Sequence, residues 1–371
     1  MRFHLKTHLI LKVEVIIMDS SLNKSILTND FNDLASLETL NLSIDKILKQ
    51  LIKIKNLNEF INTNFKNEYL KLIRNRIEDA FVKKHNDANY EVHSTLYQLY
   101  NLQISDPLSS GAFNQHQPFF YEIRNLIEEH WLNFLNLDYV LTVKDSDKSI
   151  SEHIMELCEK EKISEHKLFS FLATEANERQ LFAFFKSDYE LNIRFFDILI
   201  LTLLNSPNIT RMEMIKNLWD ESGRGNYKET HVNMFEDLIN NFNIANKNSI
   251  VSHDSWQKLA GYNLFMLASL NRRNYYTLLG IMAATEAIDP QSYIKVEEAC
   301  KRNNLTEWLY RYYSEHSELD IEHTKGWLNY VIEPIAKERD IKNDILFGTF
   351  SRLKTCKDYY DSLYQYLQLI K

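Results

Sequence analysis

Apolar side chains recur along most of this chain at the spacing of one helix face. Residues 34–54 and 120–137 place them at positions i, i+3, i+4 and i+7. The strict alternation of a half-buried strand between Gly or Pro residues is almost absent from the sequence. Only seven glycines and five prolines punctuate the 371 residues, so the helices are expected to be long. The pattern predicts a nearly all-α protein.

The helices are expected to end where proline, glycine or polar runs interrupt the apolar pattern. Pro207 restricts the residue before it, and Gly223 and Gly225 are free to adopt a positive φ. The expected ends and irregularities lie at residues 205–210, 222–226, 271–274 and 287–292 and near Pro334.

A short polar stretch, residues 142–153, is the expected boundary between two regions. Residues 1–150 are predicted to form an N-terminal helical region with a dimerisation or auxiliary role, and residues 151–371 a second helical domain. The apolar part of the N-terminal segment is interrupted by charged side chains and lacks a signal-peptide core. The polar sequence that follows Met18 favours this residue as the true start.

Composition narrows the classes of function. The formal net charge of −8 argues against a general nucleic-acid binder. The three cysteines are far apart and form no Cys-x-x-Cys pair, which argues against a thiolate zinc site or a disulfide framework and fits a reducing cytoplasm. The longest apolar runs are about half the length of a membrane span. A soluble cytoplasmic protein without a membrane partner is therefore expected.

One charged helix carries the strongest chemical pattern. In residues 308–328, His316, Asp320 and His323 are spaced i, i+4 and i+7 and therefore share one face. Two imidazoles and a carboxylate on one face suit iron, manganese or zinc. The alternative is an exposed charged helix that contains histidines by chance. Three further acids of this segment point elsewhere and are expected in solvent: Glu315, Glu318 and Glu322.

Two other segments supply matching groups. Glu286 lies in an otherwise apolar helix, where a carboxylate is costly unless it is paired or binds a metal. Alternatively, it lies near the helix end and reaches solvent. Glu221 ends one helix and His231 opens the next, so the glycine turn between them can bring both to one site. Alternatively, Glu221 is a surface acid and His231 only lies next to a helix cap.

Glu190, in the middle of an aromatic-rich helix, is a further candidate carboxylate. Asp188 is equally available, and residues at i and i+2 do not share a helix face, so at most one of the two points inward. Several carboxylates and three imidazoles are the ligands that two divalent irons need. The chain has no Glu-x-x-His sequence, so a site of this kind belongs to a helical fold other than the ferritin-like bundle.

Together these residues resemble the haem-oxygenase-like diiron oxidases and oxygenases, a family of iron-containing redox enzymes. The resemblance covers roughly residues 160–370, and its most specific part is the last triad together with the acidic residue one helix earlier. It implies a haem-oxygenase-like helical bundle that follows the N-terminal helical extension. It also implies an iron-ligand set: Glu221, His231, Glu286, His316, Asp320 and His323, with Glu190 as the extra carboxylate of N-oxygenating members.

The resemblance implies an enzyme that holds two Fe(II)/Fe(III) ions and no haem. Its expected partners are O2 and a small organic substrate, and the leading reactions are N-oxygenation of an amine or amino-acid derivative and oxidative C–C cleavage. An external electron donor and a homodimer are further expectations. Two alternatives remain open: a metal-independent or thiaminase-like enzyme of the same fold, and a non-catalytic helical binding protein.

Overall fold

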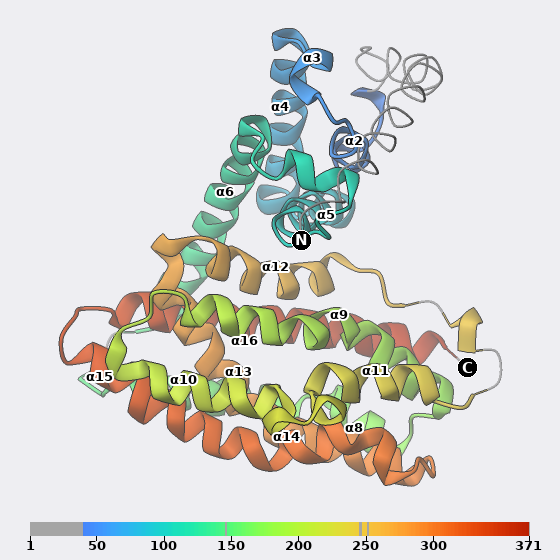
Figure 1. Cartoon of the computed structure of the whole chain (residues 1–371), viewed down its shortest axis with the longest axis vertical. Coiled ribbons are helices and arrows are strands. Elements are labelled where there is room, and N and C mark those ends of the chain that lie inside the picture. The colour runs from blue at the N-terminus through green and yellow to red at the C-terminus, as the bar shows by residue number, and fades with distance from the viewer. Residues whose placement is uncertain (1–39, 145–146, 245–246, 251, 371) are drawn as a thin grey trace, which may run out of the picture. The chain divides into compact units, whose positions relative to one another are not determined.

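The protein is described here by a computed structural model that covers residues 40–144, 147–244, 247–250 and 252–370 (Figure 1). These residues fold into helices and contain no strand, which confirms the all-α prediction. None of the described helices has the length and hydropathy needed to cross a membrane. Met18 lies outside the described residues. The chain divides into two compact units between Ile127 and Glu128, within the helix of residues 118–142, whereas the boundary predicted from the sequence is residue 150.

The first unit is a small helical cluster. It contains α2 (Ile44–Leu51), α3 (Leu57–Phe60), α4 (Thr63–Ile77), α5 (Asn86–Gln103) and the first part of α6 (Pro118–Thr142). Tyr69 is fully buried, and its hydroxyl donates a hydrogen bond of 2.6 Å to the carbonyl of Ile44. Asn114 ties down the loop after α2 by donating to the carbonyls of Ile52 and Ile54 at 2.8 and 2.7 Å. The unit is therefore helical, as expected for this part of the chain.

The second unit is a bundle of longer helices (Figure 1). Its helices are α7 (Ile150–Glu161), α8 (Lys167–Thr174), α9 (Glu178–Leu203), α10 (Asn208–Glu221), α11 (His231–Asn241), α12 (Trp256–Leu270), α13 (Tyr275–Arg302), α14 (Glu307–Gly326), α15 (Glu333–Ala336) and α16 (Lys342–Leu369). A π-helix, η9 (Trp327–Ile332), joins α14 to α15. Capping boxes at Ser149 and Asn177 start α7 and α9.

Helix α13 lies at the centre of this bundle and packs against α8, α14 and α16. It is apolar all round over its first half, which is typical of a buried helix. A Cβ atom on Gly280 would lie 2.0 Å from the carbonyl oxygen of Ile345 in α16. A Cβ atom on Gly348 would lie 2.1 Å from the carbonyl oxygen of Thr277 in α13. The two backbones are in contact here, and only glycine fits at both positions.

The prediction that α13 ends at residues 287–292 is wrong. The helix continues through Pro290 to Arg302, and Ile288 and Tyr293, two residues before and three residues after the proline, are buried. The φ angle of proline suits a helix, but proline loses the hydrogen bond to the carbonyl four residues earlier and its ring crowds that carbonyl, at a cost of about 3 kcal/mol. Burial on both sides of Pro290 outweighs that cost. The other expected interruptions occur, because α9, α10, α12 and α15 end at those positions.

Candidate metal centre

Helix α14 separates its buried and exposed groups by face. His316, Asp320 and His323 are 6%, 2% and 3% exposed. Glu318 and Glu322 are exposed on the other side of the helix. The alternative of an exposed helix with chance histidines is therefore wrong for the three residues at i, i+4 and i+7.

A glycine turn brings Glu221 and His231 together. Glu221 is the last residue of α10 and His231 the first of α11. Between them, Gly223 has a φ of +66°, and a Cβ atom there would lie 2.4 Å from the backbone carbonyl carbon of Glu229. Thr230 caps α11 by accepting a hydrogen bond from the amide of Asn233. The turn closes so tightly that His231 Nδ1 lies 2.9 Å from a Glu221 carboxylate oxygen.

Glu286 lies in the interior of α13 and is 5% exposed. The helix continues beyond it for four turns, so the alternative of a helix-end acid that reaches solvent is wrong. One of its carboxylate oxygens lies 3.5 Å from His323 Nδ1. Asp320 approaches the same nitrogen at 3.6 Å. The carboxylate that stood out in the apolar helix therefore faces the charged side of α14.

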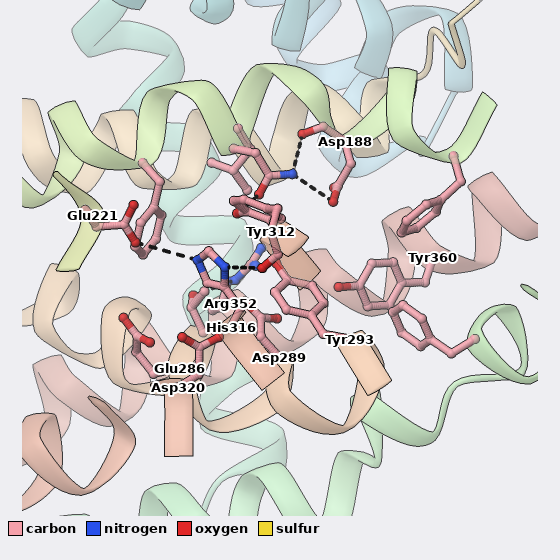
Figure 2. A pocket seen from close by; sticks show the side chains of 16 residues that line it. Asp188, Glu221, Glu286, Asp289, Tyr293, Tyr312, His316, Asp320, Arg352 and Tyr360 are labelled. Carbon is pink, nitrogen blue, oxygen red and sulfur yellow. Dashed lines mark hydrogen bonds and ion pairs between the residues drawn. The ribbon is translucent and has the colours of Figure 1, made fainter. Parts of the chain in front are cut away.

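The six buried groups form two clusters, and in each cluster the possible ligand atoms lie within 4.8 Å of one another. The clusters consist of Glu221, His231 and His316, and of Glu286, Asp320 and His323. Because His316 and Asp320 occupy successive turns of α14, the clusters are adjacent. Figure 2 shows Glu221, His316, Glu286 and Asp320 around one end of a pocket. One cluster offers two imidazoles and one carboxylate, and the other offers one imidazole and two carboxylates.

Hydrogen bonds fix which ring nitrogen each α14 histidine presents. His316 Nδ1 donates to the carbonyl of Tyr312 at 2.8 Å, so its Nε2 faces Glu221. His323 Nε2 donates to Asp220 Oδ2 at 3.1 Å, so its Nδ1 faces the second cluster. Partners of this kind orient metal-binding imidazoles and raise their basicity. Sequence reasoning assigned no role to Asp220, although its position beside Glu221 at a helix end was a usable signal.

His231 provides the test of whether this site fits a metal. Its ring is 1% exposed, and within the described part of the chain neither ring nitrogen makes a hydrogen bond, since the 2.9 Å ion pair of Nδ1 with Glu221 lacks hydrogen-bond geometry. A buried ring nitrogen without a hydrogen bond is costly. A metal ion bound between His231, Glu221 and His316 would remove that cost. Three carboxylates and three imidazoles also offset most of the charge of two divalent ions, so the residues fit a pair of irons.

Protonation balances the charges when no metal is bound. Burial and then the Asp320 carboxylate raise the pKa of Glu286 to about 7. Burial disfavours charged histidine, but Asp320, Glu286 and Asp220 raise the pKa of His323 to about 11. Burial also opposes the charge of Glu221, yet the two neighbouring imidazoles hold the pKa of that carboxyl well below its usual range. A proton therefore occupies His323 Nδ1, the nitrogen that would otherwise face a metal ion.

Glu190 is not brought to either cluster. Its carboxylate lies 3.2 Å from Lys258 Nζ and is about one-third exposed. Asp188, two residues earlier, lines the same pocket as the clustered residues (Figure 2). The expectation that only one of the two acids points inward holds, but the inward one is Asp188. Glu190 is turned away because two residues rotate a helix by about 200°.

The pocket extends from the clusters, and side chains of α8, α9, α10, α13, α14 and α16 line it. One face of α9 contributes Asp188, Leu191, Asn192 and Phe195, and the opposite walls come from α13, α14 and α16. Aromatic side chains make up much of the lining: Phe169, Phe184, Phe195, Tyr293, Tyr312 and Tyr360. Such walls exclude water from the groups that they surround.

Comparison with known proteins finds a matching family model. A family model described as an iron-containing redox enzyme matches residues 183–356, which include all six clustered residues. A search of curated proteins gave no match to the chain. The helical fold and the matched segment lead to one conclusion: residues 183–356 of this chain belong to the haem-oxygenase-like family of iron-containing redox enzymes.

Proposed function

We propose that this protein is a non-haem diiron oxidase or oxygenase that uses O2 to oxidise a small organic substrate. The observation that carries the proposal is the pair of adjacent buried clusters, whose six side chains come from four helices. Glu221, His231 and His316 would hold one ion, and Glu286, Asp320 and His323 the other. Two bound iron(II) ions would supply electrons that reduce O2 beside the substrate.

The rest of the chain orients these groups and protects them. Asp220 and the carbonyl of Tyr312 hold the two α14 imidazoles in the rotamers that face the clusters. Trp327 is fully buried, and its indole donates to Asn217 Oδ1 at 2.9 Å, one turn before Glu221. This bond joins the first residue of η9, directly after α14, to α10. The aromatic lining keeps solvent away from a reactive oxidant.

The electron balance requires a reductant. Transfer of one oxygen atom from O2 to an N–H or C–H bond, with reduction of the other atom to water, takes two electrons and two protons beyond those of the bond that is oxidised. The proposal therefore includes an external electron donor. The homodimer and the cytoplasmic location remain predictions from the sequence.

Metal analysis tests the proposal directly. Protein loaded with Fe(II) without oxygen and then desalted should hold about two irons per chain. It should then consume O2 faster than its metal-free form. Iron content near zero would overturn the proposal and favour a metal-independent enzyme or a binding protein.

Two histidine variants separate ligation from general damage. His323→Ala should hold about one iron or less per chain and retain its helical circular dichroism. His253→Ala is the matched control, because His253 is buried in the same unit but pairs with Ser362 Oγ at 2.9 Å and belongs to neither cluster. Equal iron content in both variants would refute the ligand assignment.

A further inference from the structure

Three charged side chains line the pocket beyond the iron-binding clusters. Arg352 is on α16, Asp289 on α13 and Asp188 on α9 (Figure 2). Arg352 and Asp289 are 6% and 8% exposed, and Asp188 is half-buried because it faces the pocket. Buried charges in proteins are normally paired. Among the described residues, however, none of these three forms an ion pair with another side chain.

The guanidinium of Arg352 is fixed but incompletely bonded. Its Nε donates to Thr285 Oγ1 at 2.9 Å, and its planar group lies 4.9 Å from the ring centre of Phe265. No described atom accepts a hydrogen bond from its two terminal NH2 groups. A guanidinium held in this way offers two parallel donors, which match the two oxygens of a carboxylate.

The two carboxylates have spare acceptor oxygens. Asp289 has no side-chain hydrogen bond to the described part of the chain. Asp188 accepts one bond, of 3.0 Å, from Asn192 Nδ2. Asn192 in turn accepts from the Tyr312 hydroxyl at 2.8 Å, and the Tyr312 carbonyl holds His316. Asp188 is thus connected to the first cluster, and Asp289 follows Glu286 by one turn on the same face of α13.

Two carboxylates and one guanidinium without direct pairing form a template for a ligand that carries both signs of charge. We propose that the pocket binds a zwitterion whose carboxylate pairs with Arg352 and whose protonated amine or guanidine pairs with Asp188 and Asp289. Asp188, Asp289 and Arg352 offer two carboxylates against one guanidinium, so a ligand with a carboxylate alone would be disfavoured. This assignment rests on the proposed function only in taking the pocket to be the substrate site.

A second cavity provides a route to the pocket and is also lined by groups of both charges. It shares Asp188, Leu191, Arg352 and Tyr360 with the first and continues toward Lys258 and Glu190. These two residues form an ion pair at 3.2 Å, and the side chain of Glu190 is about one-third exposed. A zwitterion entering on this side meets one group of each sign before it reaches Arg352 and the two aspartates. The position of Glu190 is thus explained by the approach to the pocket rather than by metal binding.

Calorimetric titration of the full chain tests the assignment with simple probes. The zwitterions are glycine, β-alanine, 4-aminobutyrate and 6-aminohexanoate, which differ in the distance between charges. Butyrate, which is only negative, and butylamine, which is only positive, are the single-charge probes. At least one zwitterion should bind about tenfold or more tightly than both single-charge probes, because each of these leaves one half of the template unpaired. If no zwitterion exceeds them in either the metal-free or the iron-loaded protein, the assignment is overturned.

Substitutions identify which side chain binds which charged group of the ligand. Arg352→Lys keeps the positive charge but loses the two parallel donors of the guanidinium. It should weaken zwitterion and butyrate binding about tenfold and leave butylamine binding unchanged. Asp289→Asn should weaken zwitterion and butylamine binding without weakening that of butyrate. Arg272→Lys and Asp237→Asn are matched controls, because Arg272 stacks on Tyr275 and Asp237 pairs with Arg311, outside both cavities.

The outcome is separable from the proposed function. Iron content and O2 consumption are measured independently of ligand binding, and titration needs no turnover. A protein that binds no iron but prefers a zwitterion would refute the diiron proposal and keep this one. Variants that lower thermal stability without changing the order of affinities would show that the three charges serve folding alone, which would refute the binding role.

Discussion

Replacing Gly280 by alanine tests the closest helix–helix contact of the second unit. In an ordinary helix interior this change stabilises by about 1 kcal/mol, because alanine loses less backbone entropy on folding. Here the new Cβ atom would lie 2.0 Å from the carbonyl oxygen of Ile345. Restoring the 3.4 Å of an ordinary contact requires the helices to separate by about 1.4 Å. The obstacle is backbone, so no side-chain rotation relieves it.

The expected magnitude follows from these opposing effects. Overpacking of a core costs about 1–3 kcal/mol, and an overlap with backbone belongs at the upper end of that range. Separation of the helices also breaks the 3.3 Å hydrogen bond from Thr349 Oγ1 to the Gly280 carbonyl, worth about 1 kcal/mol. After the gain in helix propensity, Gly280→Ala should lower the free energy of unfolding by about 2–3 kcal/mol. Helix α16 would carry Arg352 away from Thr285.

Tryptophan fluorescence during urea unfolding of metal-free protein measures this change. All five tryptophans lie in the second unit, so the signal reports that unit alone: Trp131, Trp219, Trp256, Trp308 and Trp327. Gly261→Ala in α12 is the matched control, because a Cβ atom there meets nothing within 4 Å. That variant should be about 1 kcal/mol more stable than the parent. If Gly280→Ala is also stabilising, the close contact between α13 and α16 is refuted.

Three further changes have defined outcomes. Asp220→Asn should weaken iron binding about 10- to 100-fold, measured by chelator competition, because His323 loses its carboxylate partner. Gly223→Ala should lower iron content with little loss of circular dichroism, because a side chain at φ +66° collides with the Glu229 backbone. His93 is buried in the first unit and burial lowers its pKa to about 3. In the unfolded chain the imidazole binds a proton near pH 6.5, but in the folded chain it stays neutral until about pH 3. The free energy of unfolding should therefore fall by about 1.4 kcal/mol for each pH unit as the pH is lowered from about 6 to 3.

Each of these predictions has a control. Asp237→Asn should leave iron affinity unchanged, and an equal loss in both aspartate variants would remove the special role of Asp220. Gly225→Ala also alters a positive φ, of +86°, but would meet only the Trp219 ring, so it should retain more iron than Gly223→Ala. His93 lies in the first unit and all five tryptophans lie in the second. Lowering the pH should therefore reduce the circular dichroism before the tryptophan fluorescence changes. A His93→Gln variant with an unaltered pH slope would contradict the argument.

Spacing along a single helix was the most informative part of the sequence. The i, i+4, i+7 pattern identified the buried face of α14, because a helix has a fixed period whatever it packs against. The glycine turn between Glu221 and His231 was also predictable, since positive φ angles strongly favour glycine. Both inferences depend on local geometry alone.

The remaining features depend on packing that no local pattern records. Helix α9 is aromatic on several sides, so its sequence did not decide whether Asp188 or Glu190 points inward. Asp289 directly precedes Pro290, where a helix end was expected, so its place on the buried face of α13 was not predicted. Arg352 was not predicted as a site residue, although an arginine in the buried middle of a long helix is a signal of a binding role. Only the contact between α13 and α16 gives that arginine its position beside Thr285.

Pro290 also has a consequence for motion. It has no amide hydrogen, so the carbonyl of Glu286 lacks the helical donor four residues ahead. The turn that carries this carboxylate is therefore held by one backbone bond fewer than its neighbours. Under the proposed function Glu286 is a ligand that adjusts when the metal changes its oxidation state, and this turn of α13 gives it local freedom. Amide hydrogen exchange should consequently be faster at residues 287–289 and 291 than in the preceding turns of the same helix.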